Sequence, residues 1–258
     1  MYRPRSRPEI QIVANVEDLA LAAALHFVDQ GKRAIDEKNL FTVALSSDSI
    51  SAAVYSRLAD DSALNRQLSW NAVHFFCAGA RHVEWGKAQR RGRTACEDIL
   101  KKLPLAPLNV HGIKARYLSA RGAAADYERQ LRKFFALKPG QLPRFDLVLL
   151  GMGVDGHAAW LYPGSKALRA SKRLVIAHRL DATDDHGITM SLPVLNNAEG
   201  IIFIVSGEDK AGIAREVLDG EYRPHHYPAQ TIEPRNGKTL WLMDKAAARL
   251  LRDDLRMS

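Results

Sequence analysis

The sequence predicts an α/β fold: one doubly wound domain over residues 1–258, with a mostly parallel sheet covered by helices on both faces. The chain has 258 residues, of which 47% are hydrophobic and 26% charged, and this composition is typical of a globular protein with a full core. Several short apolar runs lack the polar alternation of half-exposed strands, and amphipathic stretches separate them. Continuous apolar strands between helices indicate a parallel sheet that is buried on both faces.

The N-terminal half begins with a long amphipathic stretch. Its apolar residues between Leu19 and Val28 have charged residues on both sides, which favours a surface helix over a membrane span. In order, this half is predicted to contain a helix at Val13–Lys38, a strand at Phe41–Leu45, a helix at Ser49–Leu58, a strand at Ala72–Phe76, a helix at Arg93–Leu103, a weaker strand at Ala115–Ser119 and a helix at Ala123–Phe135.

The C-terminal half contains the two clearest strands, FDLVLL at Phe145–Leu150 and GIIFIV at Gly200–Val205. Apart from Asp146, both runs lack polar side chains, and both have the length of buried strands. Weaker strands are expected at Leu174–His178 and Thr239–Met243, and helices at Lys210–Leu218 and Lys245–Leu251. Because ligands of such sheets bind at the carboxyl ends of the strands, the loops of interest begin at Ser46, Cys77, Gly151 and Ser206.

Cysteine content and hydropathy limit the class of protein. Cys77 and Cys96 are too few for a disulfide framework or a structural zinc site, so we expect both to be reduced. No window approaches the roughly 20 uncharged apolar residues of a membrane helix. The segment Met1–Glu9 is basic and interrupted by proline, without the apolar core of a signal peptide. We therefore expect a cytoplasmic protein with no membrane partner.

The chain is basic, with a formal net charge of +8 and a pI near 9.6. This charge favours anionic partners, and both phosphorylated metabolites and nucleic acids qualify. The basic run Lys87–Arg93 could attract nucleic acid, but it lacks interleaved aromatic residues and any recognisable binding motif. A solvated start of a helix is the more common explanation of such a run. We therefore expect no nucleic-acid partner.

The loop after the strand at Phe145–Leu150 contains glycines in the pattern G-x-G-x-x-G, at Gly151, Gly153 and Gly156. Directly after a strand, this pattern is one feature of dinucleotide-binding sites, and Asp181 follows at a tolerable distance. However, Pro163 and the glycine after it would stop the required crossover helix after about two turns. We therefore disfavour a dinucleotide-binding oxidoreductase and expect no cofactor.

The same loop places Asp155 two residues before His157. A histidine can accept a proton from water near neutral pH because its ordinary pKa is about 6.5, and a carboxylate can orient its ring. The alternative is that Asp155 caps a helix beginning at Gly156 and that His157 is an ordinary surface residue. Composition alone does not separate these two interpretations.

The loop from Gly151 to Gly164, GMGVDGHAAWLYPG, resembles the motif G-x-G-x-D-G-H-x-A-S-L-F-P-G of the 6-phosphogluconolactonases, within the wider glucosamine-6-phosphate isomerase/lactonase family. The similarity continues over nearly the whole chain with the same order and spacing. Its other segments are Ile188–Ala198 (ITMSLPVLNNA), Ile202–Ala211 (IFIVSGEDKA), Tyr227–Gln230 (YPAQ) and Leu240–Ala247 (LWLMDKAA). The ending WLYPG of the loop favours the lactonase branch over the aminosugar deaminases.

This resemblance implies a Rossmann-like sheet and hydrolysis of 6-phospho-D-glucono-1,5-lactone without a metal, the second step of the oxidative pentose phosphate pathway. His157 matches the proposed general base, with Asp155 beside it, and backbone N–H groups between Gly151 and Gly156 would stabilise the oxyanion. Lys210 matches a position that helps to hold the phosphate. The implied substrate-binding residues are Ser46, Ser49, Arg81, Gly151, Gly153, Gly156 and Lys210.

Other segments depart from the family pattern. The phosphate loop, usually close to L-S-G-G-S-T-P, reads LSSDSIS from Leu45 to Ser51, so that Asp48 stands in place of a glycine. We expect Asp48 to cap the following helix and to weaken the binding of 6-phosphogluconate by about tenfold. Gly79 and Ala80 replace two acidic residues, and Gly187 replaces an arginine. Two alternatives therefore stay open: a weak or inactive sugar-phosphate-binding relative, and a hydrolase of a different sugar lactone. The chain is expected to be a monomer or a homodimer.

Overall fold

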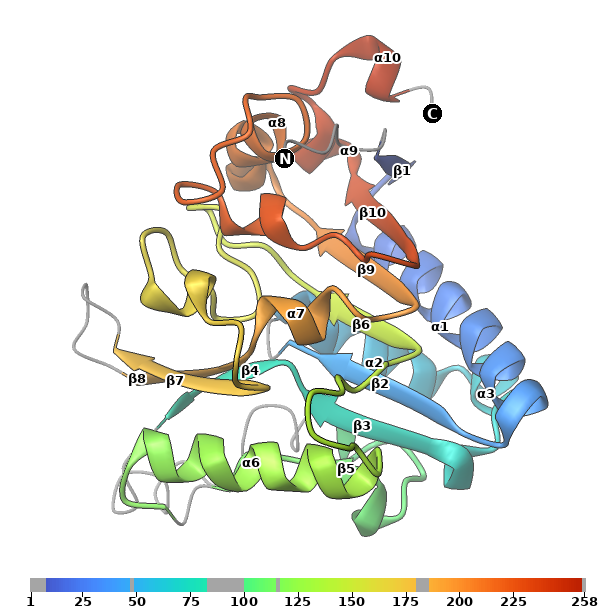
Figure 1. The fold of residues 1–258 in the computed structure, drawn as a ribbon. Helices are drawn as coiled ribbons and strands as arrows, with labels where there is room; N and C mark the ends of the chain where they lie inside the picture. Colours follow the sequence, from blue (N-terminus) through green and yellow to red (C-terminus); the bar gives the residue numbers. More distant parts are fainter. Residues whose placement is uncertain (1–7, 47–48, 83–99, 115–116, 180–185, 257–258) are drawn as a thin grey trace.

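The computed structural model describes residues 8–46, 49–82, 100–114, 117–179 and 186–256. Its centre is a seven-stranded sheet in the order β1-β10-β9-β6-β2-β3-β5, and every neighbouring pair of strands runs parallel (Figure 1). The strands are β1 (Glu9–Val13), β2 (Phe41–Leu45), β3 (Val73–Cys77), β5 (Val110–His111), β6 (Leu147–Leu150), β9 (Gly200–Val205) and β10 (Lys238–Asp244). The predicted parallel sheet is confirmed.

A second, antiparallel sheet of three strands lies at the carboxyl-terminal edge of the first. Its order is β4 (Gly79–His82), β8 (His186–Met190) and β7 (Val175–Arg179), with both pairings antiparallel. The chain passes directly from β3 into β4 through Ala78. The small sheet is therefore placed beside the ends of the central strands, where ligands of parallel sheets bind.

Helices cover both faces of the central sheet. They are α1 (Val16–Lys38), α2 (Ser49–Asp60), α3 (Ser62–Asn65), α6 (Ala120–Phe134), α7 (Leu192–Leu195), α8 (Ala211–Leu218), α9 (Lys245–Ala248) and α10 (Asp253–Arg256). The crossovers through α1 and α2 run toward β5, and those through α6 and α8 run toward β1. Because such crossovers are right-handed, the two directions place the helices on opposite faces of the sheet (Figure 1).

The direction of winding reverses between β2 and β6, which are neighbours in the sheet. At this topological switch point the loops after the two strands separate, and a crevice opens at their carboxyl ends. The first of these loops begins at Ser46 and the second at Gly151. The core below them is one cluster of buried apolar residues, including the strand residues Leu45 and Leu149.

Differences from the predicted elements are mostly at short strands. The sequence did not predict β1, β4, β5 or β8, although β1 has the alternating pattern EIQIV. The long helix begins at Val16 rather than at Val13, because the Asn15 side chain accepts a hydrogen bond from the N–H of Asp18 and caps it. Residues 117–119 of the predicted strand Ala115–Ser119 are irregular, and most of the predicted helix Arg93–Leu103 lies outside the described residues.

Within the described ranges, no helix is long and apolar enough to cross a membrane.

Candidate active site

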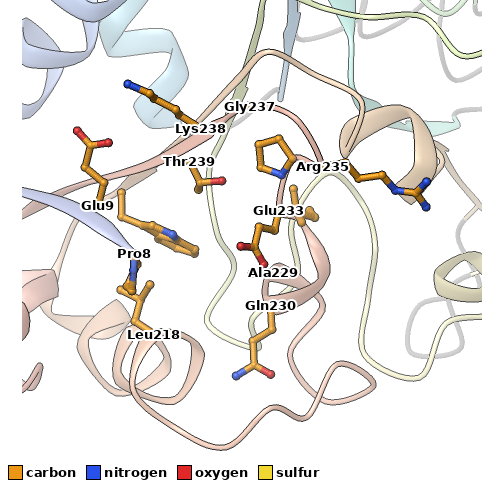
Figure 2. Close-up of a pocket in the computed structure, with 13 residues that line it drawn as sticks. Pro8, Glu9, Leu218, Ala229, Gln230, Glu233, Arg235, Gly237, Lys238 and Thr239 are labelled. Carbon is orange, nitrogen blue, oxygen red and sulfur yellow. The ribbon is translucent and has the colours of Figure 1, made fainter. Parts of the chain in front are cut away.

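The central sheet carries cavities at both ends of its strands. One, of about 380 Å³, lies at the amino ends of β1 and β10, where the Glu233 carboxylate and the Thr239 hydroxyl point toward it (Figure 2). Another, of about 260 Å³, lies at the switch point and is lined by Ser46, His157 and Lys210 among others. We assign the candidate site to the smaller cavity, because that is where a base and a cation converge.

The loop after β6 closes on itself and fixes the two residues with acid–base chemistry. His157 Nδ1 lies 2.6 Å from Asp155 Oδ1, and the same oxygen accepts the His157 backbone N–H at 3.1 Å. The Gly153 N–H donates to the His157 carbonyl at 2.9 Å, and Gly156 makes the turn with a φ of 78°. Since only glycine adopts such a φ without strain, the glycine at position 156 has a local structural cause.

The Asp155 carboxylate holds the His157 imidazole in one orientation. Burial raises the pKa of the Asp155 carboxyl, but the hydrogen bonds from the His157 ring and backbone outweigh this effect, so the pKa lies below its ordinary value. A carboxylate that stays ionised accepts the Nδ1 proton, which leaves Nε2 to accept another. The His157 ring also stacks on Tyr162, with centroids 4.2 Å apart.

No helix follows this loop: after Gly156 the chain continues in turns and a single bridge between Ala158 and Leu161. The interpretation of Asp155 as a helix cap is therefore wrong. The dinucleotide alternative fails for the same reason, because a pyrophosphate site of that kind needs the N-terminus of a helix directly after the glycines.

Ser46 joins the two loops at the switch point. Its side chain is buried, and its Oγ accepts the Gly151 N–H at 3.1 Å. Ser49 is the first residue of α2, and Ile50 and Ala53 of that helix line a further cavity of about 350 Å³. This further cavity shares Gly151, Met152 and Lys210 with the candidate site, so the two are contiguous. Asp48 and the prediction about it lie outside the described residues.

The glycine N–H groups of the loop already have acceptors. Gly151 donates to Ser46, Gly153 to His157 and Gly156 to Gly153. A ligand would therefore compete with internal hydrogen bonds for these three groups. The N–H of Met152, which also lines the cavity, donates to no acceptor in the described ranges. Sequence reasoning did not separate Met152 from its glycine neighbours, because the motif identifies the loop and not the direction of each N–H.

Lys210 reaches the cavity from the loop after β9. A short helical turn at Glu208–Lys210 precedes α8, and the Lys210 ammonium lies 3.6 Å from the carboxylate of its neighbour Asp209. The buried carboxylate of Asp244, at the end of β10, accepts hydrogen bonds from the Ser206 hydroxyl and the Gly207 N–H. Asp244 was not predicted as a site residue, and it holds the turn that carries Lys210.

Arg81 meets the site through Trp160. The guanidinium carbon of Arg81 lies 5.9 Å from the centroid of the Trp160 ring, and Trp160 lines the cavity together with Tyr162. Gly79 and Gly187 lie against the same segment, whereas Ala80 alternates to the other face of β4. The structure therefore brings Ser46, Gly151, Gly153, His157 and Lys210 to one cavity, and places Arg81 behind an aromatic ring.

Two consecutive residues of this wall are in the left-handed region, Ala159 with a φ of 50° and Trp160 with a φ of 64°. For residues other than glycine this conformation costs about 1–3 kcal/mol each. The Thr189 hydroxyl holds the segment by donating to the Ala159 carbonyl at 2.5 Å. Such strain is common at binding sites, where the surrounding structure fixes an unusual backbone.

Among the described residues, no group of three or more histidine, cysteine, aspartate or glutamate side chains could hold a metal ion.

The chain is similar to known proteins over nearly its whole length. Residues 14–241 match the family model described as glucosamine-6-phosphate isomerases/6-phosphogluconolactonase. The chain is 30% identical to a 6-phosphogluconolactonase of Synechocystis sp. over 95% of its length and 99% of that protein, and 32% identical to one of Nostoc sp. over 83% and 86%. The solved 6-phosphogluconolactonase of Trypanosoma brucei has the same fold, with a TM-score of 0.81 at 23% identity over 96% of this chain and all of that one.

Proposed function

The chain belongs to the glucosamine-6-phosphate isomerase/6-phosphogluconolactonase family. We propose that it hydrolyses 6-phospho-D-glucono-1,5-lactone to 6-phosphogluconate in the oxidative pentose phosphate pathway. The observation that carries the proposal is His157, held by Asp155, in a cavity that is also lined by Lys210. A lactone hydrolase needs a base to activate water, and a phosphorylated substrate needs a cation.

The reaction begins with water between His157 Nε2 and the lactone carbonyl. His157 takes a proton from this water as its oxygen attacks the carbonyl carbon, and Asp155 stabilises the charged ring that forms. The tetrahedral intermediate collapses by breaking the bond between that carbon and the ring oxygen. The proton held by His157 passes to the departing ring oxygen, which becomes the 5-hydroxyl of the acid product. The base is then ready for another cycle.

The oxyanion of the intermediate requires a hydrogen-bond donor in the cavity. We assign this role first to the N–H of Met152, because the N–H groups of Gly151, Gly153 and Gly156 are used within the protein. A donor of this kind contributes about 3–4 kcal/mol to the stabilisation of a transition state. The three glycines keep a role as the turn that brings this backbone close to the substrate.

The phosphate is assigned to the cavity that continues from His157 toward α2. Lys210 lines both parts of this cavity, and Ser49 begins the helix whose residues Ile50 and Ala53 form its wall. A lysine ammonium binds a phosphate as a compact charge, and the N-terminus of a helix favours an anion. Arg81 contributes positive charge from behind Trp160.

The test is a coupled assay of lactone hydrolysis, corrected for spontaneous opening, together with calorimetric titration of 6-phosphogluconate. Hydrolysis of the gluconolactone supports the proposal. Binding without hydrolysis would identify a sugar-phosphate-binding relative, and hydrolysis of other lactones alone would identify a different hydrolase. The cytoplasmic location, the monomeric or homodimeric state and the lack of a nucleic-acid partner stay predictions.

A further inference from the structure

The indole of Trp160 rests on one face of the antiparallel sheet. Alternate residues of a strand share a face, so Gly79 and Arg81 of β4 lie together, and the pairing of β4 with β8 puts Thr189 beside Gly79 and Gly187 beside Arg81. All four contact the segment that carries the indole, through a hydrogen bond, a cation–ring contact or close packing. This face of the sheet is a seat for one aromatic side chain.

The seat exists because two of its positions are glycine. A Cβ at Gly79 would lie 2.6 Å from the Ala159 carbonyl oxygen and 3.0 Å from Cδ1 of the indole. A Cβ at Gly187 would lie 3.4 Å from Cε3 of the indole and 2.8 Å from Nε2 of His178. At these two positions the family pattern predicts an acidic residue and an arginine, and it predicts serine where Trp160 stands. The Ala159 carbonyl and the indole fill the space beside Gly79, and the ring of His178 fills the space beside Gly187, where the indole lies at ordinary contact distance.

The indole also continues into the reacting end of the cavity. Its ring meets the edge of Tyr162 at a centroid distance of 5.9 Å, and Tyr162 in turn stacks on His157 at 4.2 Å. All three rings line the cavity. An indole offers one N–H donor and no acceptor, so its faces recognise a ligand by shape and apolar contact.

We propose that Trp160 determines the specificity of the cavity by packing against the carbon–hydrogen face of the lactone ring. The inference rests on the proposed function. Without the acidic residue and the arginine of the family pattern, β4 and β8 offer fewer hydrogen bonds to the sugar hydroxyl groups. The chain therefore selects the shape of the phosphorylated lactone ring more than the configuration of each hydroxyl.

The experiment compares 6-phosphoglucono-1,5-lactone with its C2 epimer, 6-phosphomannono-1,5-lactone. Apolar pockets separate close analogues by about 10–200-fold, whereas sites built to hydrogen-bond a hydroxyl reach 10⁴–10⁵. We expect the native chain to discriminate between the two lactones by less than about 100-fold in kcat/KM. Trp160→Ser should raise KM for both lactones by roughly tenfold, with a smaller change in kcat. Trp160→Phe keeps an aromatic wall and should stay within about threefold of the native KM.

Two controls distinguish a specific effect of Trp160 from a general effect of removing an aromatic ring and from loss of folding. Tyr222→Ser removes a ring that is exposed and does not line the cavity, so its KM should equal the native value. Thermal melting checks that each variant is folded. A native KM in Trp160→Ser, or native discrimination above about 10³, would overturn the role of Trp160 while leaving the lactonase intact.

Calorimetry with 1,5-anhydroglucitol 6-phosphate, which keeps a closed ring and cannot be hydrolysed, covers a chain that binds without hydrolysis. In that case the lactonase proposal fails alone, and a roughly tenfold weaker affinity of Trp160→Ser still supports the aromatic wall. Unchanged affinity in the same titration would overturn it. A native chain that neither binds this closed-ring analogue nor hydrolyses either lactone would overturn both proposals.

Discussion

Two histidines of this protein stack on an aromatic ring in nearly the same way, but one has a carboxylate as its second neighbour and the other has another histidine. His157 stacks on Tyr162 with ring centroids 4.2 Å apart, and His111 of β5 stacks on Phe76 with centroids 4.3 Å apart. The second partner of His157 is the Asp155 carboxylate at 2.6 Å, whereas that of His111 is the ring of His74 at 3.0 Å. The chemistry of each ring follows from this second partner and from its place in the sheet.

The surroundings of His111 disfavour its charged form. Burial and, to a smaller extent, the neighbouring His74 lower its pKa from 6.5 to about 4. His157, by contrast, has the carboxylate of Asp155 as its neighbour, and in the proposed mechanism this carboxylate stabilises the charged ring. Stacking on another ring therefore does not define the role of a histidine. His111 packs at the edge of the sheet, whereas we propose that His157 acts as a base at the switch point. The comparison can be tested by changing each partner in turn.

The largest effect is expected from a matched pair of substitutions. His157→Gln should lower kcat for the lactone by about 10²–10⁴-fold, because the base that activates water is removed. His111→Gln should leave kcat unchanged, since His111 does not line the cavity. Steady-state assays of both variants decide the matter. If His157→Gln keeps the native kcat, the assignment of the base is wrong.

A smaller loss is expected when the carboxylate partner becomes an amide. In Asp155→Asn the amide N–H can donate to Nδ1 of His157, which places the ring proton on Nε2 and blocks acceptance from water. We expect kcat to fall by about 10²-fold, with the protein equally stable. Because the pKa of Asp155 is lowered, protonation of this carboxyl should not set the native acid limb of kcat/KM. Asp155→Glu is the control, and it should retain more activity than Asp155→Asn.

The next effect concerns the cation that shares the cavity with His157. Lys210→Ala should raise KM by at least about tenfold, since a charged hydrogen bond to phosphate contributes about 1.5–3 kcal/mol, while kcat should change less. A lysine outside the cavity, Lys172, is the matched control, and Lys172→Ala should behave as the native chain does. A fall in kcat with an unchanged KM would contradict the phosphate role of Lys210.

The smallest effect is on stability at acid pH. Between pH 6.5 and about 4 the unfolded chain takes up a proton at His111 that the folded chain does not, so the free energy of unfolding falls as the pH falls through this range. Allowing for the partial exposure of the ring, His111 should account for about 1 kcal/mol. Urea unfolding at pH 7 and pH 4.5 measures the loss, and His111→Gln should reduce it. An equal loss in both proteins would show that His111 does not titrate in this way.

The sequence alone could predict those strands and helices that are determined by their own pattern of apolar residues. The strands at Leu147–Leu150 and Gly200–Val205 are apolar throughout, and their burial between helices follows from that pattern. Strand β4 could not be found in this way, because its sequence, GARH, has no apolar pattern. It becomes a strand through its pairing with β8. Likewise β1 has the alternating pattern of a strand, but it is only five residues long and lies directly before the long helix α1. Its alternation is therefore too short to stand out from the sequence of that helix.

The same division applies to the site. Asp155 and His157 are two residues apart, so that one loop both carries and orients them, and the sequence could identify the pair. The relation of Trp160 to Gly79 and Gly187 depends on three separate segments that meet only in the folded chain. In the sequence, each of the two glycines indicates only that a charged side chain of the family pattern is missing. Together with the indole they form a seat, and no local pattern could predict it.

The pairing of β1 with β10 sets the order in which the chain can fold. The earliest strand of the described chain meets the latest, with Glu9 opposite Leu240, so β1 has no partner in the central sheet until β10 has been synthesised. Such distant pairing raises the contact order and slows folding. During synthesis the apolar side of β1 therefore stays without its strand partner until nearly the whole chain has been made. A ribosome that stalls before β10 leaves the sheet with an unpaired edge strand.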